Sequence, residues 1–376
     1  MAKQTAAVFG AGEKAVCVKR SLTSADILVQ YFIVQDKEGV PTEIDGLPVI
    51  SAEEFFNFRK AGMLTIVNAS EPGKSSDPVV YIALDEKDQA AAASIMREHD
   101  YNEYMKVEAD SFGKMMKRYY DALHVYPSVK DIPSDEELSR DVFLAQTVNE
   151  IEGSPSVRFN PGPFAHVIQT GTAVSKTKFG SENGGNEEKP ILYDNAGENI
   201  SFLNKSYGLL TALYWMWKNT DAKVIGLSQK RRMLDIKKHE LYLLLKGELD
   251  IILPYPMISL PSCDAHRRGE LLREDWEGVK QALFELHPEG KDIFEKVLSN
   301  QYVYSESLFI GRREIVNDYC AWLFPVLTQA KKYIPAKSAT ETYRYNEFAG
   351  EILFTCYFIS NLTEARKAHT TVLVRP

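Results

Sequence analysis

The sequence predicts an α/β protein in two parts, of which the first is a small Rossmann-like domain with a parallel sheet. In the first third of the 376 residues, short apolar runs alternate with helical stretches. Strands that alternate with helices form parallel sheets, and a chain of this length fits two domains of ordinary size. We place the first domain, with a linker helix at its end, at 1–133. The second domain is expected at 140–376, because prolines and the acidic run at 134–137 come between them.

The first domain opens with an apolar run at 6–9 followed by GAGEKA, which predicts a strand, a glycine turn and a helix start. The segment 111–127 is expected to form the amphipathic linker helix, since its large apolar residues recur on one side of a helix. Further apolar runs that predict strands lie at 27–34, 46–51, 63–68 and 79–84, with helical sequence at 89–99.

The glycine turn has two interpretations. Gly10 and Gly12 form a GxG after a strand, and Asp36 follows the next strand, near where an acidic residue would meet a ribose. These three residues could bind a nucleotide. The third glycine of the fingerprint is replaced by Ala15, and a tight turn with close helix packing explains the glycines equally well.

Composition excludes several classes of function. The chain is 44% hydrophobic and 26% charged, as in ordinary globular proteins, and its net charge of −8 argues against a general nucleic-acid partner. No apolar run approaches the ~20 residues that span a bilayer, and the N-terminus lacks a signal sequence, so we expect a cytoplasmic protein. The four cysteines form no CxxC pair, which predicts buried thiols rather than a zinc site or disulfides.

The second domain is organised around residues 193–234. Their order is a polar loop, an aromatic helix expected to be capped by Ser206 and to end near Asn219, a short apolar strand at 224–227, and a basic run. The carboxyl end of a strand in an open α/β sheet is where ligands bind. That end carries Gln229, Lys230, Arg231 and Arg232.

Two groups of side chains here predict a ligand site. Arg231 and Arg232 can clamp a diphosphate, because guanidinium groups match phosphate oxygens. The polar loop can hydrogen-bond either nearby backbone or a polyhydroxylated ligand. The alternatives are an aromatic helix that only fills the core and a basic run that is only solvated. The loop residues concerned are Asp194, Asn195, Glu198 and Asn199.

This region resembles the glycosyltransferase-like family of bacterial capsular and O-antigen polysaccharide gene clusters, long catalogued as a domain of unknown function. The resemblance rests on DNAGENIS, Asn204, LLTALYWMWKN and GLSQKRRML, with DIILPYP, SLFIGRREIVNDYCAWLFPVL and RYNEFAGEILFTCYF following in order. It covers Asp141 to the C-terminus. It implies a GT-A fold, a hexosyltransferase activity, a nucleotide-sugar donor, favoured to be UDP-linked, and a glycan or lipid-linked saccharide acceptor at the inner face of the cell membrane.

The sequence departs from this family at two places. Gln229 and Lys230 stand where the family has His-Tyr, and the histidine that usually ends its first strand is missing from AQTVNE. These changes fit either an altered specificity or a reduced activity. The alternative functions are therefore a nucleotide-sugar or glycan-binding protein without catalysis and, from the glycine turn, a nicotinamide-dependent sugar-nucleotide enzyme. The missing third glycine and the lack of a nearby Tyr-x-x-x-Lys pair count against the latter.

Transfer of a sugar requires neutralisation of the leaving diphosphate and a base for the acceptor hydroxyl. No DxD occurs, so the cations at 230–232 are favoured over Mn²⁺ or Mg²⁺, for which Asp194, Glu198 and Asp250 are isolated ligand candidates. Asp250 and Glu351, with Glu347 beside it, are the candidate bases. His266 with Arg267 and Arg268 could meet an anionic acceptor, and the loop at 177–189 predicts a lid.

Overall fold

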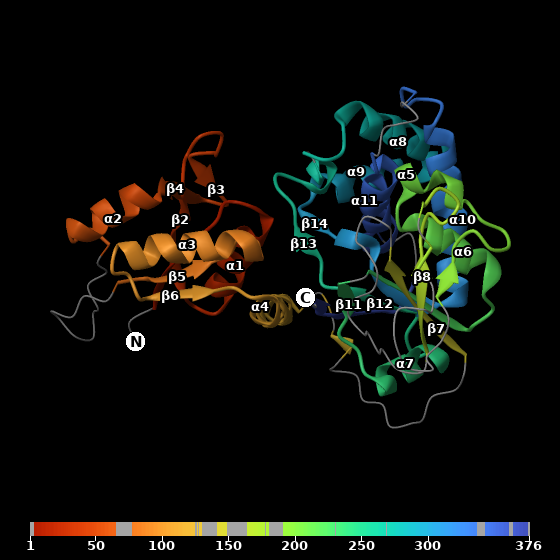
Figure 1. Cartoon of the computed structure of the whole chain (residues 1–376), viewed down its shortest axis with the longest axis horizontal. Helices are drawn as coiled ribbons and strands as arrows, with labels where there is room; N and C mark the ends of the chain where they lie inside the picture. Colours follow the sequence, from red (N-terminus) through yellow and green to blue (C-terminus); the bar gives the residue numbers. More distant parts are fainter. Residues whose placement is uncertain are drawn as a thin grey trace. The chain divides into compact units, whose positions relative to one another are not determined.

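The computed structural model describes residues 4–64, 77–124, 126, 128–129, 141–148, 164–176, 178–179, 191–229, 231–267, 269–336, 343–360 and 364–374. The chain divides into two compact units, Met1–Tyr126 and Pro127–Pro376 (Figure 1). No helix among these residues is long and apolar enough to cross a membrane. All four cysteines are buried, and none of them is in a disulfide.

The first unit is a six-stranded sheet in the order β3-β4-β2-β1-β5-β6. All pairs in it are parallel except β3 with β4, which confirms the predicted parallel sheet. The expected strand at 63–68 falls mostly outside the described residues. The strands are β1 (Thr5–Phe9), β2 (Leu28–Val34), β3 (Glu43–Ile44), β4 (Leu47–Ser51), β5 (Val79–Ile82) and β6 (Tyr104–Lys106); the helices are α1 (Glu13–Ser24), α2 (Ala52–Lys60), α3 (Glu86–Glu98) and α4 (Ala109–Leu123).

Local sequence signals set several boundaries in this unit. Ser51 ends β4 and caps α2 by accepting a hydrogen bond from the backbone N–H of Glu54, whose carboxylate accepts from Ser51 N–H in return. At the end of β1, Gly10 has φ +134°, and a Cβ there would lie 2.9 Å from the carbonyl oxygen of Ala83. Glycine is therefore required at position 10 for the close approach of β1 to the end of β5.

The second unit contains a seven-stranded sheet in the order β16-β12-β15-β10-β7-β8-β9. β7, β8, β9 and β10 are mutually parallel, whereas β15 runs antiparallel to both of its neighbours. The strands are β7 (Val142–Val148), β8 (Ala165–Gln169), β9 (Leu192–Tyr193), β10 (Val224–Gln229), β12 (Ile251–Pro254), β15 (Phe309–Arg312) and β16 (Lys367–Thr370); two small sheets pair β11 (Arg232–Leu234) with β17 (Val372–Val374) and β13 (Met257–Ile258) with β14 (Tyr302–Val303).

Alternating residues of this sheet pack on its two faces. Ile225 and Leu227 join a large core with the helices on one face, while Val224 packs with α7 on the other (Figure 1). The helix α11 is buried nearly all round, in keeping with its mostly apolar sequence. The helices are α5 (Asn204–Tyr207), α6 (Leu210–Asn219), α7 (Lys238–Leu245), α8 (Arg273–Leu286), α9 (Lys291–Ser299), α10 (Arg313–Ala330) and α11 (Tyr345–Ile359).

The aromatic helix that was expected to start after Ser206 is split into α5 and α6. Ser206 lies within the short α5 and its hydroxyl donates to the carbonyl of Leu203, so it does not cap α6. The break falls at Gly208, whose φ of +49° ends α5. α6 ends at Asn219, as predicted.

Gly208→Ala is expected to destabilise the protein by at least about 2 kcal/mol, because a Cβ there would collide with the carboxylate of Glu347 and the backbone would be strained. Urea unfolding of the full chain measures this. Gly269→Ala is the matched control, since open space surrounds that position, and its effect should stay within about 0.5 kcal/mol. Equal effects of the two changes would contradict this packing argument.

Candidate functional site

The second unit has a topological switch point at β7. The chain passes from β7 to β8 on one side, whereas β10 lies on the other side of β7. In open α/β sheets, ligands bind outside the carboxyl ends of the strands at such a point. The candidate site is therefore the edge formed by the ends of β7, β8 and β10.

The ends of β7 and β10 are held in fixed register at this edge. Gln146 is paired with Ser228, and Thr147 is paired with Gln229. The hydroxyl of Thr147 donates to the carbonyl of Ser228 at 3.2 Å, and the hydroxyl of Ser228 donates to the carbonyl of Ala145 at 2.9 Å. These bonds make the edge a rigid support for the residues that follow β10.

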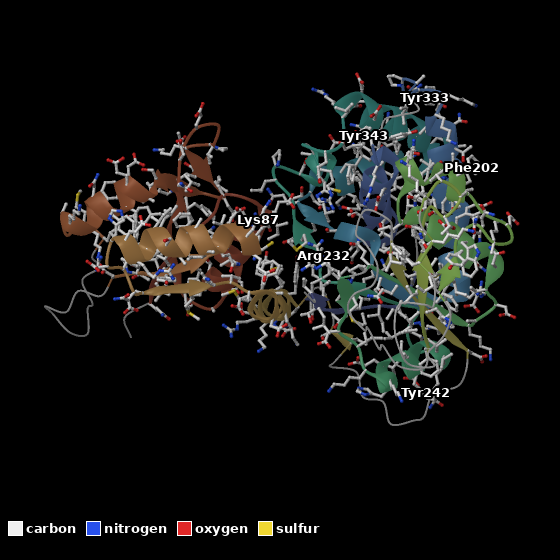
Figure 2. All side chains as sticks on the ribbon, in the orientation of Figure 1. Lys87, Phe202, Arg232, Tyr242, Tyr333 and Tyr343 are labelled. Atoms are coloured by element: carbon white, nitrogen blue, oxygen red, sulfur yellow. The ribbon has the colours of Figure 1, made fainter. Side chains whose placement is uncertain are left out.

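The basic run follows the edge directly. Gln229 is the last residue of β10 and is half-buried, and Arg231 is exposed. Arg232 is exposed as well (Figure 2). Arg232 begins β11, whose pairing with β17 holds this segment in place. Lys230 lies outside the described residues. The structure thus brings Gln229, Arg231 and Arg232 to the switch point, as the sequence analysis expected for a ligand site.

Asp194 is at the centre of a buried polar cluster, which we call the Asp194 cluster: Asp194, Gly171, Thr172, Ser201 and Thr211. Asp194 is fully buried, and its carboxylate accepts five hydrogen bonds. The donors are two backbone N–H groups of the turn after β8 and three hydroxyls, at 2.5–3.0 Å. Both oxygens are therefore committed to the protein, which gives Asp194 a positioning role in place of the predicted contact with a donor or metal.

The rest of the polar loop is fastened to α6. The indole N–H of Trp215 donates to the carbonyl of Ala196 at 2.8 Å. The side-chain amide of Asn219 accepts from the N–H of Glu198 and donates to its carbonyl, at 3.1 and 2.8 Å. Gly197 has φ +60°, and a Cβ there would collide with Asn219. The loop with the motif DNAGENIS and the helix with the motif TALYWMWKN are thus held together by side-chain hydrogen bonds.

The three remaining loop residues of the predicted donor site have different environments. Asn199 donates to the carbonyls of Asn195 and Gly197 and accepts from the N–H of Ser201, so its amide shapes the loop. Glu198 is exposed, where it accepts from the hydroxyl of Tyr214 at 3.0 Å. Asn195 is half-buried. Glu198 and Asn195 are therefore the loop residues with capacity to meet a ligand.

Asp250 lies at the opposite edge of the sheet from the candidate site. It precedes β12, at the end where β15 finishes and β16 begins. Its carboxylate accepts from Arg312 at 3.1 Å and from Arg366 at 2.8–3.0 Å. Burial raises the pKa of Asp250, but these partners outweigh it and hold the pKa below the usual range. A catalytic base needs a pKa near the working pH and a free path to the acceptor hydroxyl. The contacts of Asp250 therefore indicate an ion-pair role in place of the predicted catalytic role.

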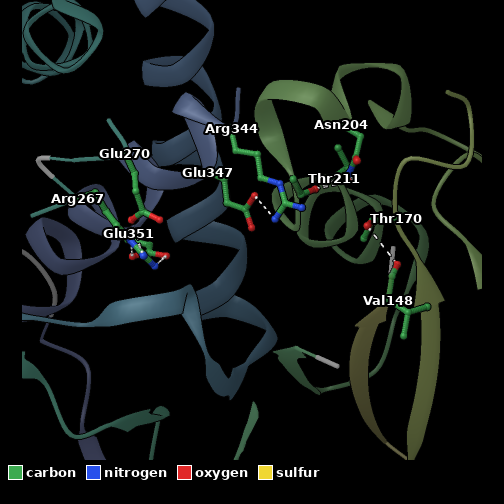
Figure 3. A network of polar contacts seen from close by, with 10 residues as sticks. Val148, Thr170, Asn204, Thr211, Arg267, Glu270, Arg344, Glu347 and Glu351 are labelled. Carbon is green, nitrogen blue, oxygen red and sulfur yellow. Dashed lines mark hydrogen bonds and ion pairs between the residues drawn. The ribbon is translucent and has the colours of Figure 1, made fainter. Parts of the chain in front are cut away.

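Glu351 is likewise enclosed by partners. Arg267 binds both carboxylate oxygens, at 2.9 and 3.0 Å (Figure 3). His266 is 3.0 Å from one of them. Burial raises the pKa of Glu351, but the hydrogen bond from His266 and the charge of Arg267 outweigh it, so the pKa lies below the usual range. Glu351 is a structural anion rather than the predicted base, and His266 and Arg267 bind it rather than an anionic acceptor. Arg268 lies outside the described residues.

The start of α11 carries Glu347, which the sequence suggested as a candidate base, and Asn346, which it did not. Glu347 is 8% exposed, and Arg344 is 3.4 Å from its carboxylate. Asn346 is fully buried, and neither atom of its amide has a hydrogen-bond partner within the described chain. An unsatisfied buried polar group costs about 1–3 kcal/mol. No sequence pattern marks Asn346, because the helix around it is apolar on every side.

The comparisons with known proteins bear on this unit. The sequence profile of a family described as a domain of unknown function, DUF4422, matches residues 165–362, more than half of the chain. The chain belongs to the DUF4422 family. Among solved structures it is similar to the apo structure of WbbM, a bifunctional glycosyltransferase, at 24% identity and a TM-score of 0.51. No curated protein matches the chain.

The similarity to WbbM covers 62% of this chain and 45% of that protein, so the chain spans less than half of its length. The α/β fold expected from the sequence is confirmed, and this match is consistent with a GT-A-like arrangement of it. The DUF4422 region begins at β8 and includes the Asp194 cluster, β10 and α11. The strand β7 and the first unit lie outside it.

The first unit places its three candidate nucleotide residues at one edge. Gly10 and Gly12 follow β1, and Asp36 follows the neighbouring parallel strand β2. Gly12 precedes α1 and has open space around it, whereas Gly10 is tightly packed. Asp36 is exposed and accepts from the N–H of Glu38 at 3.0 Å. A nucleotide site here stays a prediction.

Two further predictions concern metals and the lid. Across the described ranges, no group of three His, Cys, Asp or Glu residues is arranged to hold a metal ion. Most of the predicted lid at 177–189 lies outside those ranges. Its described beginning is anchored: the N–H of Phe179 donates to the side chain of Gln169 at 2.8 Å, and the hydroxyl of Tyr193 donates to the carbonyl of Phe179 at 2.8 Å.

Proposed function

We propose that this DUF4422 protein is a glycosyltransferase that moves a hexose from a nucleoside-diphosphate sugar, UDP-linked in the first instance, to a glycan or lipid-linked saccharide. The products would be bacterial surface polysaccharides such as capsule or O-antigen, made in the cytoplasm at the inner face of the membrane. The observation that carries the proposal is the pair Arg231 and Arg232, exposed at the carboxyl end of β10 beside the switch point of a GT-A-like sheet.

The chemistry of transfer explains why cations matter at this edge. The bond from the sugar to the diphosphate breaks, and negative charge develops on the departing phosphate oxygens. Guanidinium groups that already face those oxygens stabilise this charge with little rearrangement. In the proposal, Arg231 and Arg232 bind the diphosphate, Gln229 and Lys230 flank it, and Glu198 and Asn195 are available to sugar hydroxyls. Mn²⁺ or Mg²⁺ bound with the phosphates would supply the same stabilisation.

Arg231→Ala combined with Arg232→Ala is expected to weaken binding of UDP and UDP-hexoses by roughly 10- to 100-fold, since a charge-assisted hydrogen bond contributes about 1.5–3 kcal/mol. Isothermal titration calorimetry of the full chain, with and without Mn²⁺, measures this. The effect should shrink at high salt, because screening already weakens the wild-type interaction. Arg97→Ala with Arg273→Ala removes the same charge from exposed positions elsewhere and is the control.

Three results would separate this proposal from its alternatives. Binding together with release of UDP in the presence of a saccharide acceptor supports a transferase. Binding of a nucleotide sugar without transfer to any saccharide favours the binding-protein alternative, to which the departure at Gln229 and Lys230 points. Stabilisation by a nicotinamide dinucleotide alone, lost when Gly12 is replaced, would contradict the transferase proposal.

A further inference from the structure

The side-chain amide of Asn346 is an exception to a general rule of protein interiors. Buried polar groups are nearly always hydrogen-bonded, yet Asn346 is 0% exposed, and its Oδ1 and Nδ2 have no partner in the described part of the chain. Leucine has nearly the same size and would carry no such penalty. The asparagine at this position lowers the stability of the fold, so we looked for its function in ligand binding rather than in packing.

The groups around Asn346 identify the chemistry of that role. Asn346 lies in the first turn of α11, where the leading N–H groups of a helix have no partners within the helix. Arg344, the residue before α11, makes no side-chain capping hydrogen bond there. The carboxylate of Glu347 follows, with the guanidinium of Arg344 at 3.4 Å from it (Figure 3). The start of α11 therefore presents an amide, a carboxylate and a guanidinium within one turn.

A continuous set of contacts joins this turn to the candidate site. Gly171, which follows β8, packs against the side chain of Asn204. The amide of Asn204 donates to the carbonyl of Gly208 at 2.8 Å, and Gly208 packs against the carboxylate of Glu347. Two residues, Asn204 and Gly208, thus lie between the start of α11 and Gly171 in the turn after β8.

We infer that the start of α11 is a sugar-hydroxyl subsite in which Asn346 and Glu347 bind neighbouring hydroxyls of a hexose. A hydroxyl both donates and accepts, an amide offers a donor and an acceptor, and a carboxylate accepts. The carboxylate disfavours a phosphate at this place, which leaves the diphosphate to Arg231 and Arg232. The inference rests on the proposed function and deepens it.

Binding requires the first turn of α11 to move, because Asn346 is enclosed. Local openings at the ends of elements cost less free energy than opening of the element's interior. The ligand hydroxyls then provide the partners that the amide lacks. These hydroxyls belong either to the donor hexose or to the acceptor saccharide, and the experiment distinguishes the two.

The test replaces Asn346 by leucine in the full chain. The melting temperature of the protein alone should rise by about 2–4 °C, because an unsatisfied amide is removed. Affinity for UDP should be unchanged. If the hexose belongs to the donor, the extra affinity of a UDP-hexose over UDP falls at least 10-fold. If it belongs to the acceptor, binding of a methyl hexoside in the presence of UDP falls at least 10-fold instead.

A matched control and a second variant keep the result interpretable. Asn219→Leu removes an amide that has three hydrogen bonds to backbone groups, so it should lower the melting temperature. Asn346→Ala removes the amide without adding branched bulk and should reproduce the loss of hexose binding. A lower melting temperature in both Asn346 variants with hexose binding retained would identify a structural amide and overturn the inference.

Two other results would also overturn it. Unchanged affinity for UDP-hexoses and methyl hexosides in Asn346→Leu would mean that the amide binds only an internal water. A wild-type protein that binds UDP, but neither favours UDP-hexoses nor binds hexosides, has no hexose subsite. Failure of the proposed function gives a different pattern, in which the wild type binds neither UDP nor any UDP-hexose.

Discussion

Replacing Asp194 by alanine should destabilise the second unit by at least about 3–5 kcal/mol, one of the two largest effects expected in the chain. Asp194 is fully buried and accepts five hydrogen bonds, which join the turn after β8 to Ser201 and to α6. Its loss removes the acceptor of two N–H groups and of the hydroxyls of Thr172 and Ser201, and each unsatisfied group carries its own cost.

Urea unfolding and the melting temperature of the full chain measure the effect of Asp194→Ala. Asp292→Ala is the control, because Asp292 is exposed and surface substitutions usually change stability by less than about 0.5 kcal/mol. If Asp194 instead faced a ligand, its replacement would abolish nucleotide-sugar binding with little loss of stability. That outcome would restore the role that the sequence alone suggested.

Replacing Glu351 by alanine should cost a similar 3–5 kcal/mol, because Arg267 and His266 would remain largely buried without their anion. A double-mutant cycle tests the pair. Arg267→Met combined with Glu351→Leu should cost much less than the sum of the single changes, since no charge is then left unmatched. Additive effects of the two substitutions would contradict the coupling.

The contribution of Glu351 should also depend on pH. Its pKa is below the usual range in the folded protein, so its stabilising effect is complete above the unfolded pKa of about 4.3 and is lost as the pH falls through the folded pKa. The difference in unfolding free energy between wild type and Glu351→Gln should therefore shrink as the pH falls below about 4.3. A difference that keeps growing below that pH would contradict the assignment.

The elements that sequence analysis predicted well have local causes. Apolar runs that alternate with helices predicted the parallel sheet of the first unit, and the glycine turn after β1 follows from a backbone position that excludes a Cβ. The order of loop, helix, strand and cations placed Arg231 and Arg232 at a strand end, because the carboxyl ends of parallel strands share an edge.

The structure gives the candidate catalytic acids protein partners that no local sequence pattern indicates. Asp250 lies between α7 and β12, and it precedes β12 at the far edge of the sheet. Short apolar runs fit a strand and a buried helix alike. Glu351, Glu347 and Asn346 lie on one helix that is buried almost all round, so periodicity cannot tell which faces a site.

The sequence by itself therefore determined the α/β class, the family and the position of the cations, because each depends on residue order and backbone preference within a short segment. Only the tertiary structure decided the role of each acidic side chain. That role depends on which partners arrive from distant segments: Thr211 and Gly171 at Asp194, Arg366 and Arg312 at Asp250, and Arg267 at Glu351. A carboxylate that those partners satisfy holds the fold, whatever its place in a motif.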